Sequence, residues 1–195
     1  MVTESVRAAQ ESGLVVARGE FARAFRQVPG PVAVVLVRTV GGPIRGITCT
    51  SATSLSAAPP MAVFSVDAKT GVADEVRRAG KYSINYLAAD RAEWARAFAS
   101  GGAALDALVP VIRDGRSSAP TLATGTTAVL ECEVADVLPG GDHWIVTGRI
   151  THSRTQSDAP ALVYVAGRYG RFVEAADTVP AHTPDPAPLP PPTFQ

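Results

Sequence analysis

The stretch Gly46-Ile47-Thr48-Cys49-Thr50-Ser51-Ala52-Thr53-Ser54-Leu55-Ser56-Ala57-Ala58-Pro59-Pro60 lies between two apolar, strand-like segments. It holds six Ser and Thr hydroxyls in 15 residues and no charged side chain. Each hydroxyl can both donate and accept a hydrogen bond, and so can the backbone of an irregular loop. We therefore expect a hydroxyl-rich loop that suits a neutral polar ring or a phosphate. An ordinary Ser/Thr-rich turn is the alternative interpretation.

The segments around this stretch predict an antiparallel β protein. Residues 32–37 form a continuous apolar run, the pattern of a strand buried on both faces, and Gly41-Gly42-Pro43 turns the chain into a second strand. Further strands are predicted over residues 61–66, 82–87, 127–137, 143–150 and 161–165, and short helices near residues 20–28, 70–79 and 90–100. Many strands with only two or three helices favour a barrel over alternating βαβ units.

The length of 195 residues is most simply one domain with additions at both ends. We expect a flexible leader over residues 1–18, a folded domain over 19–175 and a Pro-rich tail over 176–195. The tail is expected to be disordered rather than to lie on a partner subunit. Residues 103–120 are expected to form a long irregular loop of a functional kind.

Composition excludes several classes of protein. A formal net charge of zero, with scattered basic residues, argues against nucleic-acid binding. No apolar run approaches the roughly 20 residues of a membrane span, and the N-terminus lacks the apolar core of a signal peptide. Cys49 and Cys132 are expected to be buried thiols in a reducing compartment. We therefore expect a cytoplasmic protein.

Motifs for metal, serine-hydrolase and common nucleotide chemistry are absent from the sequence. The three histidines are dispersed, so no metal site is expected. There is no GxSxG elbow, no GxGxxG after a strand and no P-loop. Lys69 and Thr70 directly precede a predicted helix, where an ammonium, a hydroxyl and free N–H groups can meet a phosphate. Simple helix capping with a solvated Lys69 is the alternative, and Asp67 would oppose an anion unless it points away.

Two further places could contact a ligand. His143 follows a tight turn and begins a strand, so it is either a surface residue or faces a cofactor at the barrel mouth, with Trp144 on the opposite side of the sheet. Arg168 and Tyr169 lie between two glycines. Such a pair can hold an anionic, stacked dinucleotide, and it is equally suited to a dimer interface.

Five segments, in order, resemble the short-chain flavin reductases, the reductase components of two-component flavin monooxygenases. They are Gly46-Ile47-Thr48-Cys49-Thr50-Ser51 with Ser54, Ser56 and Pro59-Pro60; Ser65-Val66 with Lys69-Thr70; residues 82–87 with 94–99; Gly141-Asp142-His143-Trp144-Ile145-Val146; and Leu162-Val163-Tyr164 with Gly167-Arg168-Tyr169. The resemblance covers roughly residues 20–173. It implies a six-stranded antiparallel Greek-key split β-barrel that forms a homodimer and binds FMN or FAD near the dimer interface.

The resemblance also assigns roles to residues. The isoalloxazine would be lined by Thr48, Cys49, Thr50 and Ser51, with Ala52 beside it. The ribityl chain and phosphate would be held by Ser65, Val66, Lys69 and Thr70. NADH or NADPH would dock at His143, Arg168 and Tyr169. Three positions depart from the family: Thr50 is often Asn, Ala52 is often a large aromatic residue, and Pro29-Gly30-Pro31 replaces a Thr-Gly pair. The first two departures would affect flavin choice or tightness.

The function implied by the resemblance is an NAD(P)H-dependent flavin reductase. Hydride would pass from nicotinamide C4 to flavin N5, and reduced flavin would leave for a separate monooxygenase. His143 would orient the nicotinamide. Two alternatives stay open: a flavin-binding module without turnover, and a flavoenzyme that uses a tightly held flavin on its own organic substrate.

Overall fold

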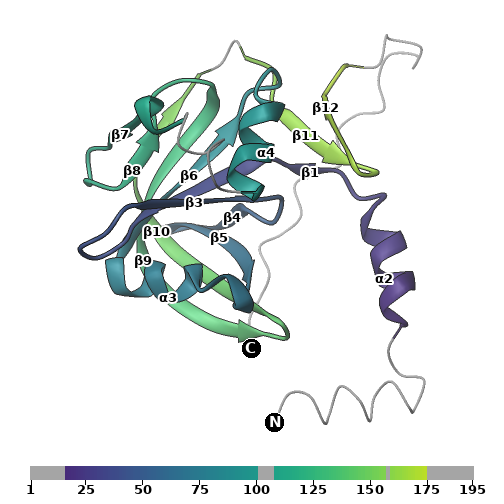
Figure 1. Cartoon of the computed structure of the whole chain (residues 1–195), viewed down its shortest axis with the longest axis horizontal. Helices are drawn as coiled ribbons and strands as arrows, with labels where there is room; N and C mark the ends of the chain where they lie inside the picture. The colour runs from purple at the N-terminus through teal and green to yellow at the C-terminus, as the bar shows by residue number, and fades with distance from the viewer. Residues whose placement is uncertain (1–15, 101–107, 157–158, 175–195) are drawn as a thin grey trace.

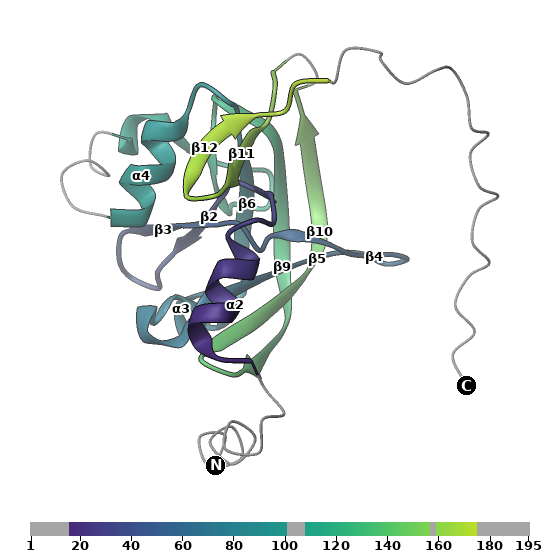
Figure 2. The same cartoon turned by 90° about the vertical axis from the view of Figure 1, so that its right-hand side faces the viewer.

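A computed structural model of the chain describes residues 16–100, 108–156 and 159–174. Its main feature is a seven-stranded antiparallel sheet with the strand order β3-β2-β6-β9-β10-β5-β4, which curls into an open barrel (Figures 1 and 2). The strands are β2 (Ala33–Arg38), β3 (Ile44–Cys49), β4 (Thr53–Ala57), β5 (Pro60–Asp67), β6 (Lys81–Leu87), β9 (Thr126–Gly140) and β10 (His143–Thr155). The predicted mainly β class is therefore confirmed.

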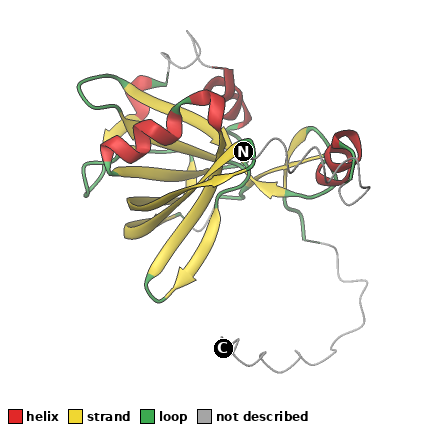
Figure 3. Cartoon of the chain, turned by 90° about the horizontal axis from the view of Figure 1, so that it is seen from below, coloured by secondary structure: helices red, strands yellow, loops and turns green. Residues whose placement is uncertain are grey.

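Two small sheets and three helices complete the described part of the fold (Figure 3). A three-stranded sheet contains β1 (Gly30–Pro31), β11 (Leu162–Val165) and β12 (Arg168–Arg171), and a hairpin pairs β7 (Ile112–Asp114) with β8 (Pro120–Leu122). The helices are α2 (Arg18–Phe25), α3 (Val72–Ala79) and α4 (Ala92–Ser100), with 3-10 turns η1 (Ala68–Thr70) and η2 (Val109–Val111).

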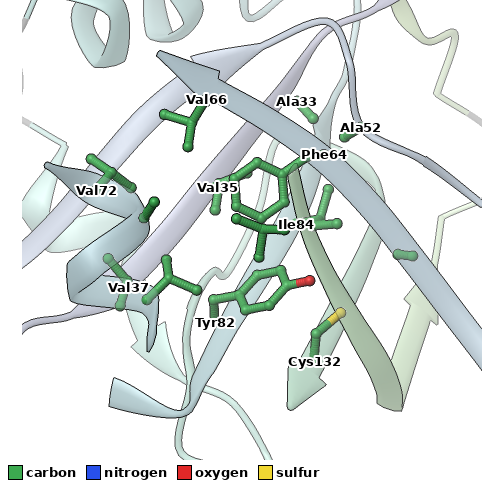
Figure 4. Close-up of a cluster of buried hydrophobic side chains, with 14 residues drawn as sticks. Ala33, Val35, Val37, Ala52, Phe64, Val66, Val72, Tyr82, Ile84 and Cys132 are labelled. Atoms are coloured by element: carbon green, nitrogen blue, oxygen red, sulfur yellow. The ribbon is translucent and has the colours of Figure 1, made fainter. Parts of the chain in front are cut away.

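Strand β2 separates two hydrophobic cores, as its unbroken apolar sequence predicts. Successive side chains of a strand point to opposite faces. Val35 and Val37 therefore pack inside the barrel, in the cluster that contains Phe64 (Figure 4). Leu36 points the other way and packs with Phe98 of α4. Burial on both faces fixes the register of β2, and β2 in turn fixes the position of β3.

Strand β3 passes close beneath α4. A Cβ atom at Gly46 would lie 2.4 Å from the Phe98 ring and 2.8 Å from the Leu36 side chain, so no larger residue fits there without movement. Two residues further on, the Thr48 hydroxyl donates a 2.6 Å hydrogen bond to the Ala95 carbonyl of α4. These two contacts hold the last residues of β3, and the loop after it, against the helix.

Two expectations for irregular segments were wrong. Residues 53–57 form strand β4 rather than loop, which raises the sheet from the expected six strands to seven. Strand β4 is at the sheet edge and mostly exposed, so its Ser and Thr residues carry no apolar alternation that reveals a strand. Within 103–120, residues 112–114 and 120–122 pair as a hairpin. Residues 101–107 lie outside the described part of the chain.

The predictions for the chain ends fall mostly outside the described residues. Of the leader predicted over residues 1–18, residues 1–15 lie outside the described part of the chain, and so does the whole Pro-rich tail over 176–195. Helix α2 begins at Arg18, two residues before the predicted start. Within the described ranges, no helix has the length and apolar character that a membrane crossing requires.

Candidate functional site

A cavity of about 580 Å³ lies between the ends of β3 and β5, with residues of α2 and α4 in its lining. This volume lies within the roughly 300–1,000 Å³ of small-molecule sites. The lining residues come from five parts of the chain: Phe21 and Phe25; Ile47, Thr48, Cys49, Thr50 and Ser51; Ser65, Val66, Asp67 and Thr70; Phe98 and Ala99; and His143. Most of them are neutral, which fits the expectation of a surface for an uncharged polar ring.

Ser51, just after β3, is joined to Ser65 of β5 at one end of this cavity. Its hydroxyl accepts a 3.0 Å hydrogen bond from the Ser65 N–H and donates a 3.1 Å hydrogen bond to the Ser65 carbonyl. The hydroxyls of Ser51 and Thr48 are therefore both engaged within the protein. The polar atoms that remain for a ligand are mainly those of the backbone. Strand β3 is an edge strand, so alternate N–H and C=O groups point away from β2.

Cys49 contributes a neutral surface to the cavity. Burial raises the pKa of its thiol to about 11, against the weaker opposing effect of hydrogen bonds from Ala52 and Ser51. At neutral pH the side chain is a thiol and not a thiolate, so it is a poor nucleophile. Cys49 and Cys132 are both free cysteines, as predicted; Cys132 is buried as expected, whereas Cys49 is only half-buried.

The turn after β5 forms a second wall. Asp67 Oδ1 accepts a 2.8 Å hydrogen bond from the Lys69 N–H, which directs this carboxylate into its own turn. The Thr70 hydroxyl donates to the Asp67 carbonyl at 2.8 Å and accepts from the Val72 N–H at 3.3 Å. Thr70 therefore caps the first N–H of α3. The Lys69 ammonium has no hydrogen-bond partner among the described residues.

His143 forms the third wall. It lies opposite Asp67 in the β5–β10 pairing, and its Nδ1 atom is 2.6 Å from Asp142 Oδ1. The hydrogen bond and the charge of the imidazole lower the pKa of the Asp142 carboxyl. A carboxylate can only accept from Nδ1–H, and in the neutral form of such a ring Nε2 is an acceptor. Trp144 lies on the opposite face, with the Arg77 guanidinium 5.3 Å from its ring centroid.

Eight of the predicted site residues line the one cavity: Thr48, Cys49, Thr50, Ser51, Ser65, Val66, Thr70 and His143. Four do not. Ala52 is 1% exposed and packs in the barrel core, so its small side chain opens no space in the cavity. Lys69 is exposed beside the cavity and does not line it. Arg168 and Tyr169 lie on β12, outside it.

Tyr169 is connected to the site through an adjoining hollow of about 430 Å³. This hollow shares Phe25, Thr50 and Ser51 with the larger cavity, and Tyr164 lines it as well. The Tyr169 ring lies 5.1 Å from that of Tyr164. Tyr169 thus supports a wall of the hollow from behind. Its own ring is also covered by the guanidinium of Arg96, 5.1 Å away.

Sequence reasoning missed the aromatic part of the cavity. Phe21 and Phe25 of α2 and Phe98 of α4 line it. The i, i+4 spacing of Phe21 and Phe25 predicts a helix face, but the sequence does not reveal what that face contacts. In the structure α2 buries none of its residues, and its two phenylalanines are 53% and 61% exposed.

The arrangement suits ligand binding without a reactive side chain. The cavity has neutral polar walls, an unreactive thiol and one imidazole held by a carboxylate. Across the described ranges, no three His, Cys, Asp or Glu residues gather in a way that could hold a metal ion. The side chains that line the cavity carry no hydride donor or acceptor, so hydride transfer here would use a bound organic cofactor.

The chain belongs to the flavin reductase like domain family, whose model matches residues 25–172. This match and the fold of a solved relative confirm the antiparallel split barrel that the resemblance implies. That relative is the NADH:FAD oxidoreductase of Streptomyces globisporus in complex with NAD and FAD fragments. It is 29% identical with a TM-score of 0.74, and the match covers 82% of this chain and 95% of that one.

Two characterised relatives match over similar lengths. The reductase component of a 4-nitrophenol 4-monooxygenase/4-nitrocatechol 2-monooxygenase from Rhodococcus opacus is 33% identical over 156 residues, which is 80% of this chain and 82% of the relative. The actinorhodin polyketide dimerase of Streptomyces coelicolor is 29% identical over 166 residues, which is 85% of this chain and 93% of the relative.

Proposed function

We propose that this protein is an NAD(P)H-dependent flavin reductase that passes hydride from nicotinamide to FMN or FAD and releases reduced flavin to a separate monooxygenase. The observation that carries the proposal is the neutral cavity between β3 and β5, in a chain of the flavin reductase like family. Such a reaction needs alignment of two ring systems and no nucleophilic side chain.

The residues present fit a flavin ring. Free backbone groups along the edge of β3, and around Thr50 and Ser51, offer alternating donors and acceptors for the polar rim of the ring. The Phe98 side chain and the uncharged Cys49 thiol offer apolar surface. When bound, the flavin supplies the hydride acceptor. The protein fixes its position and limits access of water to it.

For the phosphate end of the flavin we propose Lys69 and Thr70. Thr70 lines the cavity, and the Lys69 ammonium lies on the same turn without a described partner. The Asp67 carboxylate is held in its own turn by the Lys69 N–H, which reduces its opposition to an anion. Because the Thr70 hydroxyl already caps Val72, Lys69 supplies the main attraction.

For the nicotinamide we propose the hollow between Phe25 and Tyr164, which adjoins the flavin cavity. His143 Nε2 would accept a hydrogen bond from the carboxamide and orient the ring. Its imidazole is fixed by Asp142, which makes His143 an orienting group rather than a proton donor. Arg168 and Tyr169 act less directly, since both lie on β12 outside the cavity and the Tyr169 ring packs behind that of Tyr164.

We further propose that the protein forms a homodimer through the apolar face of α2. Phe21, Phe25 and Val28 are more than half exposed although they are large and apolar. Exposed apolar clusters of this kind commonly mark an interface. A second copy over this face would also enclose the cavity that Phe21 and Phe25 line.

We propose a cytoplasmic location, because the reaction consumes NADH or NADPH and the cysteines are free.

The test is an oxidation assay with purified protein, each of FMN and FAD, and each of NADH and NADPH. We expect turnover with at least one combination, and reduced flavin in the filtrate after anaerobic ultrafiltration. Absence of turnover in all four combinations would refute the proposal.

Sedimentation equilibrium on the same sample tests the homodimer, and a monomer at micromolar concentration would contradict it.

A second candidate function rests on the similarity to the polyketide dimerase. In that case the flavin stays bound and acts on an organic substrate of this protein. The ultrafiltration step separates the two candidates: flavin that remains with the protein after reduction favours the second, and flavin in the filtrate favours the first.

A further inference from the structure

A second cavity, of about 530 Å³, lies at the other end of the long β9–β10 pair. Its walls are the β7–β8 hairpin and the residues around Glu131 and Arg154, and none of its lining residues belongs to the candidate flavin cavity. His143 and His152 are nine residues apart on β10, which corresponds to about 30 Å along the strand. A ligand here would not take part in hydride transfer.

The lining of this cavity holds more basic than acidic side chains. Arg113, Arg116, His152 and Arg154 all contribute to it. The guanidinium of Arg154 donates to the carbonyls of Leu122 at 2.7 Å and Ala123 at 3.1 Å. A guanidinium has five N–H donors, so each such group keeps free donors after these contacts. The backbone thus holds Arg154 in place with donors available.

Arg113 is held in the same manner. Its guanidinium donates to its neighbouring Ile112 carbonyl at 2.8 Å and also to the carbonyl of Pro110. Arg116 lies on the tip of the β7–β8 hairpin, and its side chain is exposed toward the cavity. Preorganised guanidinium groups lose less side-chain entropy on binding an anion than flexible ones.

The two acidic residues of the cavity both have partners within the protein, although the Glu131 carboxylate keeps its negative charge. Asp114 pairs with Arg38. Glu131 accepts hydrogen bonds from the Arg116 N–H at 3.0 Å and from the N–H and hydroxyl of Ser117, both at 2.6 Å. Within the described ranges, no carboxylate lies within ion-pair distance of Arg113, Arg116 or Arg154. The lining thus carries three guanidinium groups against two carboxylates, one of which is paired with Arg38, so positive charge is in local excess in this concave surface.

We propose that this cavity binds a small polyanion with phosphate or carboxylate groups, at a site separate from the flavin and nicotinamide. Guanidinium groups engage both kinds of anion through paired N–H donors. Three of them around one cavity favour a ligand with two or more negative charges. The concave shape favours a small molecule over the flat contact of an acidic protein surface.

The test uses the full chain with FAD at saturating concentration, so that any phosphate subsite of the flavin cavity is filled. Inorganic pyrophosphate and citrate are titrated separately at low ionic strength by isothermal calorimetry. The variant is Arg113→Gln/Arg116→Gln, which changes two lining residues. The matched control is Arg149→Gln, an exposed arginine of β10 that does not line the cavity.

We expect saturable binding of at least one anion, with a dissociation constant about 10-fold or more weaker in the double variant, as expected for loss of two charge-assisted contacts, and nearly unchanged in the control. Tighter binding of pyrophosphate identifies a phosphate ligand, and tighter binding of citrate a polycarboxylate. Absence of saturable binding of both anions would overturn the proposal, as would equal affinities in the double variant and the wild type. Binding of an acidic peptide alone would overturn it in favour of a protein contact.

Discussion

Ser51 and Ser65 are joined by two hydrogen bonds, because one hydroxyl both accepts from the Ser65 N–H and donates to the Ser65 carbonyl. This contact connects the end of β3 to β5 at the point where the barrel is open. It positions the loop that we propose to contact the flavin ring. The hydroxyl is therefore a structural group of the site rather than a direct ligand of the flavin.

The Ser51→Ala substitution removes both hydrogen bonds. We expect it to lower the free energy of unfolding by about 1–2 kcal/mol, since a neutral hydrogen bond contributes about 1 kcal/mol net. Flavin affinity should fall as well, because the loop after β3 loses its anchor. Urea unfolding and flavin titration measure the two effects. Ser54→Ala, at an exposed position of β4, is the control. If both variants behave alike, Ser51 does not close the site.

The Asp142→Asn substitution tests the orientation of His143. The Asp142 carboxylate accepts from Nδ1–H and so leaves Nε2 as an acceptor toward the cavity. An amide at this position also presents donors to Nδ1 and weakens the preference for that tautomer. We expect a higher KM for NADH or NADPH with little change in flavin affinity. An unchanged KM in this variant and in His143→Ala would remove the orienting role.

Glu131 is expected to contribute pH-dependent stability. Burial opposes its charge, but the hydrogen bonds from Ser117 and Arg116 outweigh burial and lower the pKa of its carboxyl. A lowered folded-state pKa stabilises the protein above the unfolded pKa of about 4.3, and this contribution is lost as the pH falls through the folded-state value. We expect Glu131→Gln to cost about 1–3 kcal/mol at pH 7.

This cost should shrink as the pH is lowered toward 3, because the wild-type carboxyl then becomes protonated too. Denaturant unfolding at several pH values measures it. Glu133→Gln, at an exposed position of the same strand, is the matched control. A constant difference between Glu131→Gln and wild type across this range would contradict the assignment.

Gly148 is required by its contact with Tyr82. A Cβ atom there would lie 2.5 Å from the Tyr82 hydroxyl oxygen and 2.9 Å from the Glu133 carbonyl. We expect Gly148→Ala to destabilise the fold by about 1–3 kcal/mol through overpacking. Tyr82→Phe in the same chain should recover part of this loss. Gly170→Ala, with no atom near its Cβ, is the control.

Tyr82→Phe alone should have little effect. The Tyr82 hydroxyl is buried, has no hydrogen-bond partner by geometry among the described residues, and is turned toward the Cys132 thiol, a weak partner (Figure 4). A double-mutant cycle measured by thermal unfolding gives the coupling energy between the two positions. Additive effects of the two substitutions would show that the Tyr82 hydroxyl does not limit residue size at position 148.

The sequence predicted those parts of the fold that hydrophobic patterning controls. Strand β2 follows from its unbroken apolar run, and helix α3 follows from apolar residues at the helical period. Strand β4 could not be recognised, because an exposed edge strand of Ser and Thr has no buried face to create a pattern. The β7–β8 hairpin was missed for a different reason: each of its strands has only three residues, too few to show an alternating pattern.

The candidate site was predictable because five sequence segments resemble those of the flavin reductases and occur in the same order. Such motifs indicate which segments meet, but not how each side chain is used. Ala52 points into the core, and the hydroxyls of Thr48 and Ser51 are bound internally. These details depend on contacts between distant segments, which no local pattern encodes. The contribution of Phe21 and Phe25 depends in the same way on where α2 lies.

The most direct test of the proposed function is anaerobic single-turnover reduction of protein-bound flavin. The protein is saturated with its preferred flavin and mixed with NADH or NADPH that carries deuterium at one or the other C4 position, while oxidised-flavin absorbance is followed. We predict rapid loss of this absorbance, slower with deuterium at one of the two positions, because hydride leaves C4 from a fixed orientation. Absence of reduction, or rates that are insensitive to deuterium at both positions, would contradict direct hydride transfer at this site.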